Sequence, residues 1–332
     1  MSEKSPLDIS LGVTTGIPVN LSLKLSVKAD KNHYSTIWVG DDILKAEVFT
    51  YTSIIANHVK NIQIGLGVIS PYVYPLSTIA SASLTLSEIT ENNFILGLGV
   101  GGSVEVKSLT GLQPVNVISK LKNTVTALKK IFNQEPVNFE DHDEKLVGFK
   151  LSFAKYSIPI FLGVRGPKLL ELAGRIADGV IFSTPLRMLN KSINIVEKSA
   201  FKAGRNPGQI RKILWNGFIL LEDAGDLKLA KNVVLTIISS MSSSLLNELG
   251  LDRELTSLIR SEFFKGNKAA AMKYVTDDLI REFCIFGSID EIKETFFKIR
   301  NMGIDEVIIG PPFGSKPFKI IQIMRPENLW RK

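Results

Sequence analysis

Short apolar runs alternate with amphipathic segments along the whole chain. The runs predict eight β-strands, at Ile9–Thr14, Thr36–Val39, Ile62–Val68, Phe94–Leu98, Pro159–Leu162, Gly179–Phe182, Ile213–Leu220 and Glu306–Ile309. Between them, segments such as Ile43–His58 and Val117–Phe132 carry the apolar period of a helix. The chain is therefore predicted to repeat a strand and a helix from end to end.

This repeat favours one fold class. Strands that alternate with helices pair in parallel through right-handed crossovers. About eight such units predict a single α/β domain, a (β/α)8 TIM barrel over residues 1–332, which is an ordinary length for that fold. Two segments interrupt the rhythm: residues 135–157 are predicted to be an inserted hairpin or loop, and residues 225–285 an extra helical region without a strand.

Four of the predicted strands end in glycine-rich turns. The turns are IQIGLGVIS, FILGLGVGG, IFLGVRG and VIIGPPFG. In a barrel the carboxyl ends of the strands form the active-site face, and glycine there lets a ligand lie against bare backbone. Four such turns on one face favour a large flat ligand that carries a phosphate.

The turn GVRGPKLLELAG has a particular chemistry. Gly166 and Pro167 stand at the expected start of a helix, where free N–H groups and the helix dipole favour an anion. Arg165 could add a charge-assisted contact to a phosphate. The alternative interpretation is a tight turn between strand and helix with surface charges.

The segment GLGVGG, from Gly97 to Gly102, matches the G-x-G-x-x-G dinucleotide fingerprint. That fingerprint needs a helix directly after it and an acid about 20 residues further on. Here SVEVKSLTG is a poor helix start, and no acid lies near Lys122. We therefore reject a dinucleotide fold and keep Gly97, Gly99 and Gly101 as positions of close backbone approach.

Two acidic positions are candidates for proton transfer. Asp41 and Asp42 follow the strand TIWVG, and one alternative is that they cap the helix of ILKAEVF. Asp41 lies nearer the strand end and is the better candidate for a group that faces a pocket. Glu105 follows GLGVGG on the same face, and its alternative is a solvated loop residue.

Composition restricts the partners. The net charge of +7 comes from dispersed Lys and Arg, which argues against nucleic acid and suits a polyanionic small molecule. The single cysteine, Cys284, excludes a disulfide framework and suits a reduced, cytoplasmic setting, and no long apolar run predicts a membrane span. The three histidines, His33, His58 and His142, show no metal-ligand spacing, so no metal site is expected.

Several segments together resemble a known family. They are IGLGVISPYVYPLSTIASASLTLSEI, FILGLGVGG, IPIFLGVRGPKLLELAGRIADGVIF, GNKAAAMKYVTDDLIREF and FGSIDEIKETFFKIRNMGIDEVIIGPPFG. Over nearly its whole length the chain resembles the bacterial-luciferase-like (β/α)8 superfamily. Within that superfamily it is most similar to methylenetetrahydromethanopterin reductases, which use the deazaflavin coenzyme F420.

The resemblance implies a cofactor, a reaction and an assembly. The deazaflavin ring would lie across the barrel mouth, backed by a non-prolyl cis peptide at Gly67–Val68, next to Ile69. The phosphate-bearing tail would meet the turn formed by Gly163, Val164, Arg165 and Gly166. Hydride would pass to a one-carbon unit on a pterin, so that a methylene group becomes methyl. Relatives suggest a homo-oligomer, a dimer or a tetramer.

One position departs from the family pattern. The family carries a glutamate near the end of the first strand, where this chain has LGVTT with Thr14 in place of the acid. Either Glu105 or Asp41 substitutes for it, or the substrate differs. Two alternatives therefore stand beside the F420 reductase: an FMN-dependent luciferase-like monooxygenase or reductase, and a non-catalytic barrel that binds a flavin or pterin.

Overall fold

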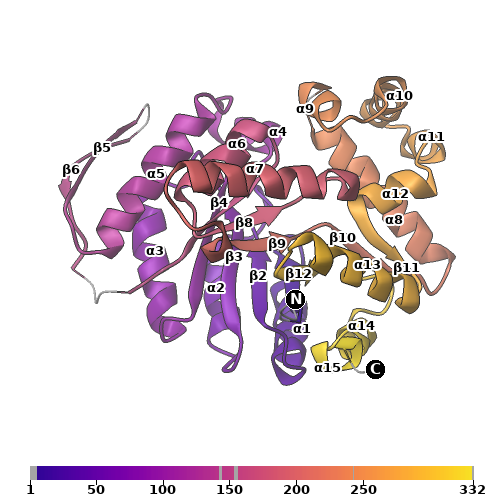
Figure 1. The fold of residues 1–332 in the computed structure, drawn as a ribbon, viewed down its shortest axis with the longest axis horizontal. Coiled ribbons are helices and arrows are strands. Elements are labelled where there is room, and N and C mark those ends of the chain that lie inside the picture. Colours follow the sequence, from indigo (N-terminus) through magenta and orange to yellow (C-terminus); the bar gives the residue numbers. More distant parts are fainter. Residues whose placement is uncertain (1–5, 142–143, 153–155, 242, 331–332) are drawn as a thin grey trace.

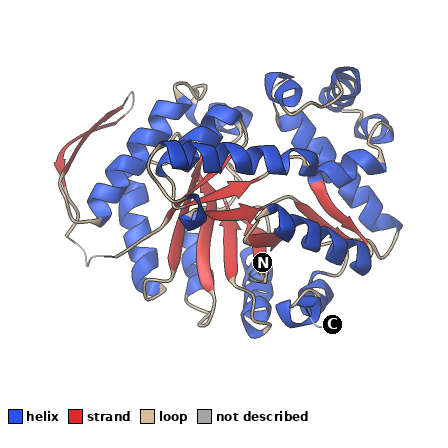
Figure 2. Ribbon diagram, viewed as in Figure 1, coloured by secondary structure: helices blue, strands red, loops and turns tan. Residues whose placement is uncertain are grey.

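Eight parallel strands close into a barrel in the computed structural model of the chain, which describes residues 6–141, 144–152, 156–241 and 243–330 (Figures 1 and 2). Each strand pairs with its neighbours around the ring in the order β1-β12-β9-β8-β7-β4-β3-β2. The barrel strands are β1 (Asp8–Thr14), β2 (Thr36–Gly40), β3 (Gln63–Ile69), β4 (Phe94–Gly99), β7 (Ile160–Val164), β8 (Gly179–Phe182), β9 (Arg211–Leu214) and β12 (Glu306–Ile309). The predicted (β/α)8 barrel is confirmed.

Helices wrap the barrel between successive strands (Figure 2). They are α1 (Val19–Lys31), α2 (Val48–Ala56), α3 (Leu76–Ile89), α4 (Ser103–Thr110), α5 (Val117–Phe132), α6 (Pro167–Ile176), α7 (Leu189–Lys202), α13 (Ile289–Met302), α14 (Pro317–Ile323) and α15 (Pro326–Trp330). Short 3-10 turns lie at Leu186–Met188 and Pro207–Gln209. Pro167 occupies the first turn of α6 as expected, and Leu172 and Ala173 on the inner face of this helix are buried.

A β-hairpin lies within the segment where an insertion is predicted. Its strands, β5 (Val137–Asp141) and β6 (Glu144–Phe149), pair with each other and extend along the side of the barrel (Figure 1). Glu144 accepts the backbone N–H of Leu76 at 2.7 Å and so caps the start of α3. Residues 142–143, which include His142, and residues 153–155 of this segment lie outside the described part of the chain.

The prediction of a single strand over Ile213–Leu220 is wrong. The apolar run divides into β9, which belongs to the barrel, and β10 (Gly217–Leu220), which pairs outside it with β11 (Cys284–Gly287). The chain changes direction at Trp215 and Asn216, whose side chains donate to the carbonyls of Gly310 and Thr184. The Asn216-Gly217 pair at this break is a turn signal, which the apolar residues on both sides of it obscured.

The helical region after β10 has an apolar core of its own. It comprises α8 (Ala224–Ser240), α9 (Ser243–Glu248), α10 (Arg253–Phe264), α11 (Lys268–Lys273) and α12 (Asp277–Phe283). Residues such as Val234, Ile238, Ile259 and Ile280 pack together in a cluster separate from the barrel core. Residues 284–285 were also expected to be non-strand, whereas they begin β11, because their apolar side chains are buried against β10.

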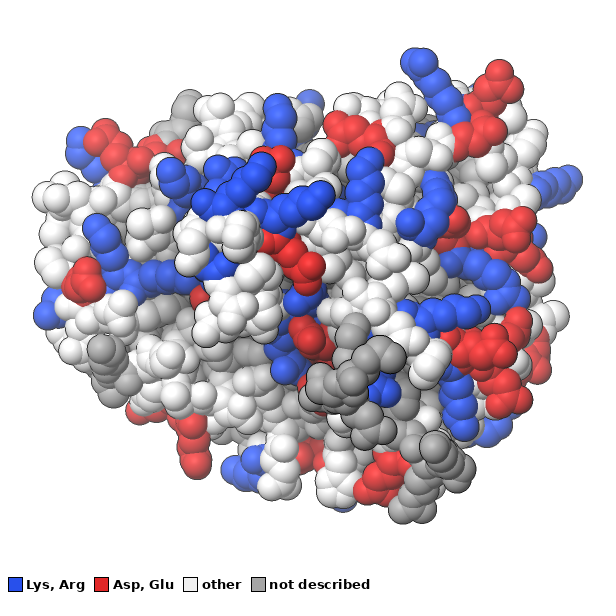
Figure 3. Space-filling view, viewed as in Figure 1, with Lys and Arg blue, Asp and Glu red and all other residues white. Residues whose placement is uncertain are grey.

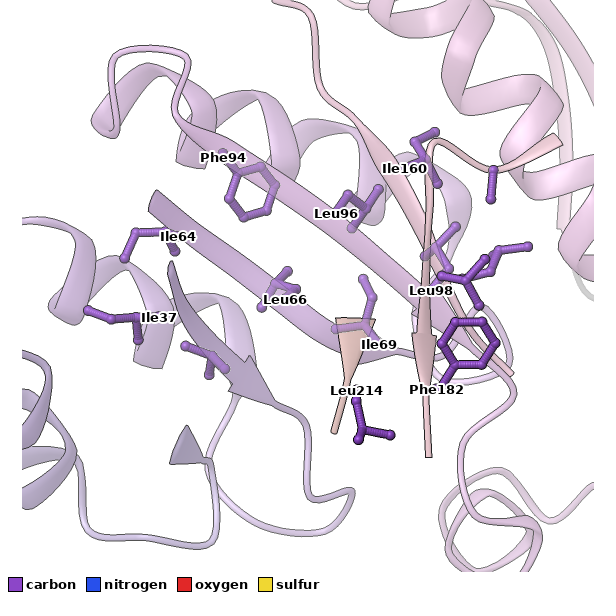
Figure 4. Close-up of a cluster of buried hydrophobic side chains, with 14 of the residues drawn as sticks. Ile37, Ile64, Leu66, Ile69, Phe94, Leu96, Leu98, Ile160, Phe182 and Leu214 are labelled. Atoms are coloured by element: carbon purple, nitrogen blue, oxygen red, sulfur yellow. The ribbon is translucent and has the colours of Figure 1, made fainter. Parts of the chain in front are cut away.

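The strand residues that point outward form the main core. In the register of the sheet, Ile37 lies opposite Ile64, and Leu66 lies opposite Leu96. These side chains are fully buried beneath the surrounding helices, and Figure 4 shows them along neighbouring strands. Alternation along each strand sends every second residue inward, so the barrel interior is filled by a different set of side chains.

At its amino-terminal end the barrel is closed by a buried charge cluster. The Glu306 carboxylate is fully buried and accepts hydrogen bonds from Ser10 Oγ at 2.6 Å and Trp38 Nε1 at 2.7 Å. Arg211 donates to the same carboxylate from Nε at 2.9 Å and also pairs with Asp8 at 2.7 Å. The charge of Glu306 is thus fully partnered by three donors from three other strands.

Charges on the surface are mixed in sign. On the face seen in Figure 3, Lys and Arg are interspersed with Asp and Glu. Within the described residues, no helix has the length and apolar character that crossing a bilayer requires.

Glu306→Gln is expected to destabilise the fold by about 2–4 kcal/mol, because it removes a buried charge and leaves Arg211 with one fewer partner. Urea unfolding of the variant and of wild type would measure the difference. Glu294→Gln is the matched control, since that carboxylate lies on the solvent face of α13 and should change stability by less than about 0.5 kcal/mol. Equal urea midpoints for the two variants would contradict a structural role for the charge cluster around Glu306.

Candidate active site at the barrel mouth

Glycine occupies the inward positions near the carboxyl ends of most barrel strands. Below them the interior is filled by Trp38, Ile95, Phe161, Ile181, Ile213 and Ile308. Above this layer the inward positions are Gly12 on β1, Gly40 on β2, Gly67 on β3, Gly97 and Gly99 on β4, and Gly163 on β7. At these positions the strands contribute no side chain to the top of the barrel.

The side chain of Val68 fills one half of this space. A Cβ on Gly99 would lie 2.5 Å from Val68 Cγ2, and one on Gly163 would lie 2.6 Å from Val68 Cγ1. The peptide bond between Gly67 and Val68 is cis, as the resemblance implied. Val68 therefore projects from β3 across β4 and β7, and it forms part of the floor of the mouth.

This packing changes the interpretation of the glycine-rich turns. Gly99 and Gly163 lack a Cβ because Val68 occupies that volume, and Gly97 lacks one because the Leu66 carbonyl would lie 2.1 Å from it. Gly101 adopts φ +79°, a conformation that favours glycine, next to Ile43 and Val106. Ile69 and Val164 point into the outer core, so they can offer the mouth only their backbone.

The indole of Trp215 fills the other half of the mouth. A Cβ on Gly12 would lie 2.7 Å from the ring, one on Gly67 would lie 2.8 Å from it, and one on Gly40 would lie 3.4 Å from it. The ring therefore spans β1, β2 and β3 although its residue follows β9. Its Nε1 donates to the Gly310 carbonyl at 2.8 Å, which fixes the plane of the ring.

Asp41 is the carboxyl whose pKa is raised most at this end of the barrel, among the residues that the structure describes. It follows β2 and is half-buried, and its Oδ2 has no hydrogen-bond partner among the residues that the structure describes. Burial raises the pKa of the Asp41 carboxyl from 3.8 to about 6, and the charges of Asp42 and Glu47 add to this, while the Tyr74 hydroxyl acts in the opposite direction. With this pKa the carboxyl is half protonated near pH 6 and still roughly one-tenth protonated at pH 7.

The neighbouring positions have structural roles. Asp42 accepts the backbone N–H of Gly16 at 3.2 Å and so ties two loops together. Neither Asp41 nor Asp42 caps α2, which begins later in the chain, with Glu47 as its N-cap accepting from Phe49 and Thr50. Thr14 ends β1, with its methyl group toward Gly40, and its backbone carbonyl accepts from the Tyr51 hydroxyl at 2.9 Å.

The segment after GLGVGG is a helix, contrary to the expectation from its sequence. α4 begins at Ser103 with Gly102 as N-cap, and Glu105 lies in its first turn. The Glu105 carboxylate folds back over Gly102, at the amino end of its own helix, where a negative charge is favoured. This local interaction replaces the missing polar cap and explains why the helix forms. The closed barrel still excludes the dinucleotide fold.

A cavity adjoins the turn between β7 and α6. It has a volume of ≈ 170 Å³, and its lining includes Arg165, Gly166, Lys191 and Ser192, with Glu248 from α9 on another side. Gly166 is open, since the nearest described atom to its missing Cβ is Glu248 Oε2 at 3.8 Å. Arg165 donates to the Ser183 carbonyl at 3.0 Å and to its hydroxyl at 3.2 Å, and burial lowers the pKa of Arg165. These two hydrogen bonds hold the guanidinium in place. It remains charged, because the pKa of arginine lies far above neutral pH even when burial lowers it.

No group of three or more His, Cys, Asp and Glu side chains within the described ranges is arranged to hold a metal ion.

Comparison with known proteins identifies the family. The family of luciferase-like monooxygenases matches residues 5–306 of the chain. The chain belongs to this family. Its fold is also that of the coenzyme F420-dependent tetrahydromethanopterin reductase from Methanopyrus kandleri, with a TM-score of 0.85 and 22% identity over 96% of this chain and 97% of that one.

Two curated relatives are similar along most of their length. The 5,10-methylenetetrahydromethanopterin reductase of Methanolobus tindarius is 27% identical over 302 residues, which cover 90% of this chain and 92% of the relative. The enzyme of the same name from Archaeoglobus fulgidus is 27% identical over 306 residues, with the same coverage of both chains. The luciferase-like family and its reductase branch were both recognised from the sequence motifs.

Three residues of the site were missed from the sequence. Trp215 lay inside a run that read as one strand. Tyr74 lies in the aromatic loop SPYVYP directly after β3, which was a usable signal beside a candidate acid. Lys191 reaches the cavity from α7, and a single lysine on an amphipathic helix gives no signal of its own.

Gly99→Ala is expected to destabilise this luciferase-like barrel by about 1–3 kcal/mol, because the added methyl group would overlap Val68 and lie 3.2 Å from the Gly163 carbonyl. Thermal unfolding would report the loss. Gly208→Ala, in an exposed 3-10 turn, is the control and should leave the melting temperature nearly unchanged. A Gly99→Ala protein as stable as wild type would show that Val68 does not fill this volume.

Proposed function

We propose that this luciferase-like barrel is a coenzyme F420-dependent oxidoreductase that reduces the methylene group of a methylenetetrahydropterin to methyl. The similarity to methylenetetrahydromethanopterin reductases over 90% of the chain supports this activity. The observation that carries it is the partly buried Asp41 carboxyl at the barrel mouth, with one unpartnered oxygen and a raised pKa.

The residues present fit the cofactor. Val68 and Trp215 form an apolar floor of the width of a ring system, and the cavity beside α6 offers Arg165, Lys191 and the free N–H groups of a helix start for a phosphate. When bound, the reduced deazaflavin supplies the hydride. The protein contributes the floor, the anchor for the tail and the exclusion of water from the mouth.

Asp41 is the group that we assign to proton transfer. Opening a methylene bridge between two nitrogens leaves one nitrogen in need of a proton, so an acid at the mouth assists the step. A carboxyl whose pKa is about 6 holds and releases a proton near neutral pH. The Thr14 hydroxyl is far too weak an acid, and the Glu105 carboxylate lies against its own helix start.

We further expect a homo-oligomer, a dimer or a tetramer, and a cytoplasmic setting. The exposed apolar side chains of Val104, Leu109, Leu112 and Val115, which follow β4, support an assembly between copies. The single, buried thiol of Cys284 supports a reduced compartment.

Asp41→Asn is expected to lower kcat by about 10²–10⁴-fold, because the amide cannot donate the proton. Wild-type kcat/KM should fall as the pH rises through about 6, and this dependence should vanish in the variant. Asp42→Asn is the matched control and should keep most of the activity, since that carboxylate joins two loops and acts on Asp41 only through its charge, which adds to the larger effect of burial. A control that loses as much rate as Asp41→Asn would remove Asp41 from the mechanism.

The same substitution makes a separate prediction about stability. Between pH of about 4 and about 6 the unfolded chain releases the Asp41 proton while the folded chain keeps it, so folding stability falls as the pH rises through this interval. At pH 7.5 Asp41→Asn should therefore be more stable than wild type, by on the order of 1–2 kcal/mol. Urea unfolding at pH 4 and 7.5 measures this effect without any ligand.

The cofactor is tested by equilibrium titration of the apo protein with oxidised F420 and, separately, with FMN. We expect F420 to bind at least tenfold more tightly, followed by reduction of methylenetetrahydromethanopterin. Tighter binding of FMN, with consumption of oxygen on turnover, would replace the proposal with a flavin monooxygenase. Binding of F420 without turnover of the pterin would instead support a non-catalytic barrel.

A further inference from the structure

We propose that Trp215 is the platform on which the reacting heteroaromatic ring lies, and that it determines the depth and orientation at which the ring is held. The inference rests on the proposed function, since it assigns a ligand contact within the same mouth. Trp215 was not among the predicted site residues, and its indole packs against β1, β2 and β3.

The indole leaves no room for a side chain at two inward glycines. A Cβ on Gly67 would lie 2.8 Å from the ring, and one on Gly12 would lie 2.7 Å from the ring and 2.2 Å from the Gly310 carbonyl. A Cβ on Gly40 would lie 3.4 Å from the ring, which is an ordinary contact. The indole therefore lies against the backbone of β1 and β3 and touches β2, at the packing density of a protein interior.

The ring is held rigidly from its own side as well. Trp215 donates its backbone N–H to the Phe182 carbonyl at 2.8 Å and its indole N–H to the Gly310 carbonyl at 2.8 Å. The next residue, Asn216, donates to the Thr184 carbonyl at 2.9 Å. These contacts to β8, to the segment after β12 and to the loop after β8 leave the indole a single orientation, which is what a preorganised binding surface requires.

One part of the indole remains accessible. Trp215 is only partly buried, whereas Trp38 and Ile308 in the layer below are fully buried. Because the interior beneath the indole is filled, its exposed part faces the mouth. The floor continues from Trp215 through Gly67 to Val68, so it reaches from the β1–β3 side, where Asp41 follows β2, toward β7 and the Arg165 cavity.

A flat aromatic ring on this floor would be supported by contact with the indole. Stacking of a heteroaromatic ring on an aromatic side chain contributes about 1–3 kcal/mol when measured by truncation, which corresponds to about 5–150-fold in affinity. The contact would also fix the height of the ring relative to the Asp41 carboxyl, so both binding and the chemical rate depend on it.

The test compares Trp215→Phe and Trp215→Leu with wild type. We expect Trp215→Leu to raise the Kd for oxidised F420 at least tenfold and to lower kcat, whereas Trp215→Phe, which keeps an aromatic face, should change Kd less than about threefold. The same loss is expected with the tail-less deazariboflavin fragment as the probe, because the platform holds the ring and not the phosphate. Equilibrium dialysis gives Kd, and steady-state rates separate KM from kcat.

Trp38→Phe is the matched structural control. It removes the hydrogen bond to Glu306 one layer lower, so it should reduce the melting temperature while leaving the Kd for F420 unchanged in the folded protein. If Trp215→Leu lowers only the melting temperature and binds F420 as wild type does, the platform is overturned while the proposed function stands. If wild type binds neither F420 nor FMN, both are overturned.

Discussion

The structure depends on how a closed barrel fills its own interior. Eight strands enclose a volume that side chains must occupy at the density of a crystal. Here the middle layer is filled by large residues such as Trp38 and Phe161, but the upper inward positions are glycines. The side chains of Val68 and Trp215 fill the space beside these glycines. Together they form a flat floor at the carboxyl end of the barrel.

Two carboxylates of the barrel differ in how completely their hydrogen bonds are satisfied. Glu306 is buried among donors from Ser10, Trp38 and Arg211, and each oxygen is satisfied. Asp41 is also withdrawn from water, but one of its oxygens is left without a partner in the described structure. The Asp41 oxygen is therefore open to a further hydrogen bond at the carboxyl end of the barrel, whereas the Glu306 carboxylate at the other end is not.

Much of the fold can be predicted because local patterns in the sequence determine its strands and helices. The alternation of apolar runs and helical periods placed seven of the eight barrel strands to within a few residues. Several segments together led to the correct family, and the resemblance implied the cis peptide between Gly67 and Val68. The break at Trp215 was missed although Asn216-Gly217 is a turn signal, because the apolar run continues on both sides of it and hydrogen bonds to distant strands fix its geometry. The helix after Gly102 was missed because Glu105, inside the helix, supplies the charge at its start.

The sequence predicted which residue types lie at the candidate site, but not the packing that requires glycine there. Glycines at the strand ends do mark the mouth, yet Val68 occupies the volume beside Gly99 and Gly163, and the Leu66 carbonyl occupies that beside Gly97. Sequence gives the position of a missing side chain, and only the packing shows which neighbour has taken its place. The raised pKa of Asp41 likewise arises from burial by segments far apart in the chain, which no local pattern encodes.

The helical region over residues 224–283 has its own apolar core, and this division has a kinetic consequence. The region is joined to the barrel through the short β10–β11 pair, through Asp226, which accepts the backbone N–H of Ser315 at 2.9 Å, and through Arg187, which donates to the carbonyls of Leu249 and Gly250 and pairs with Glu282. A unit with a separate core opens with a smaller free energy than the whole molecule. Amide protons of α8 and α10 would then exchange while those of the barrel strands stay protected. When the region opens, one wall of the Arg165 cavity moves away from the barrel, which admits a long, charged ligand tail without any movement of the strands.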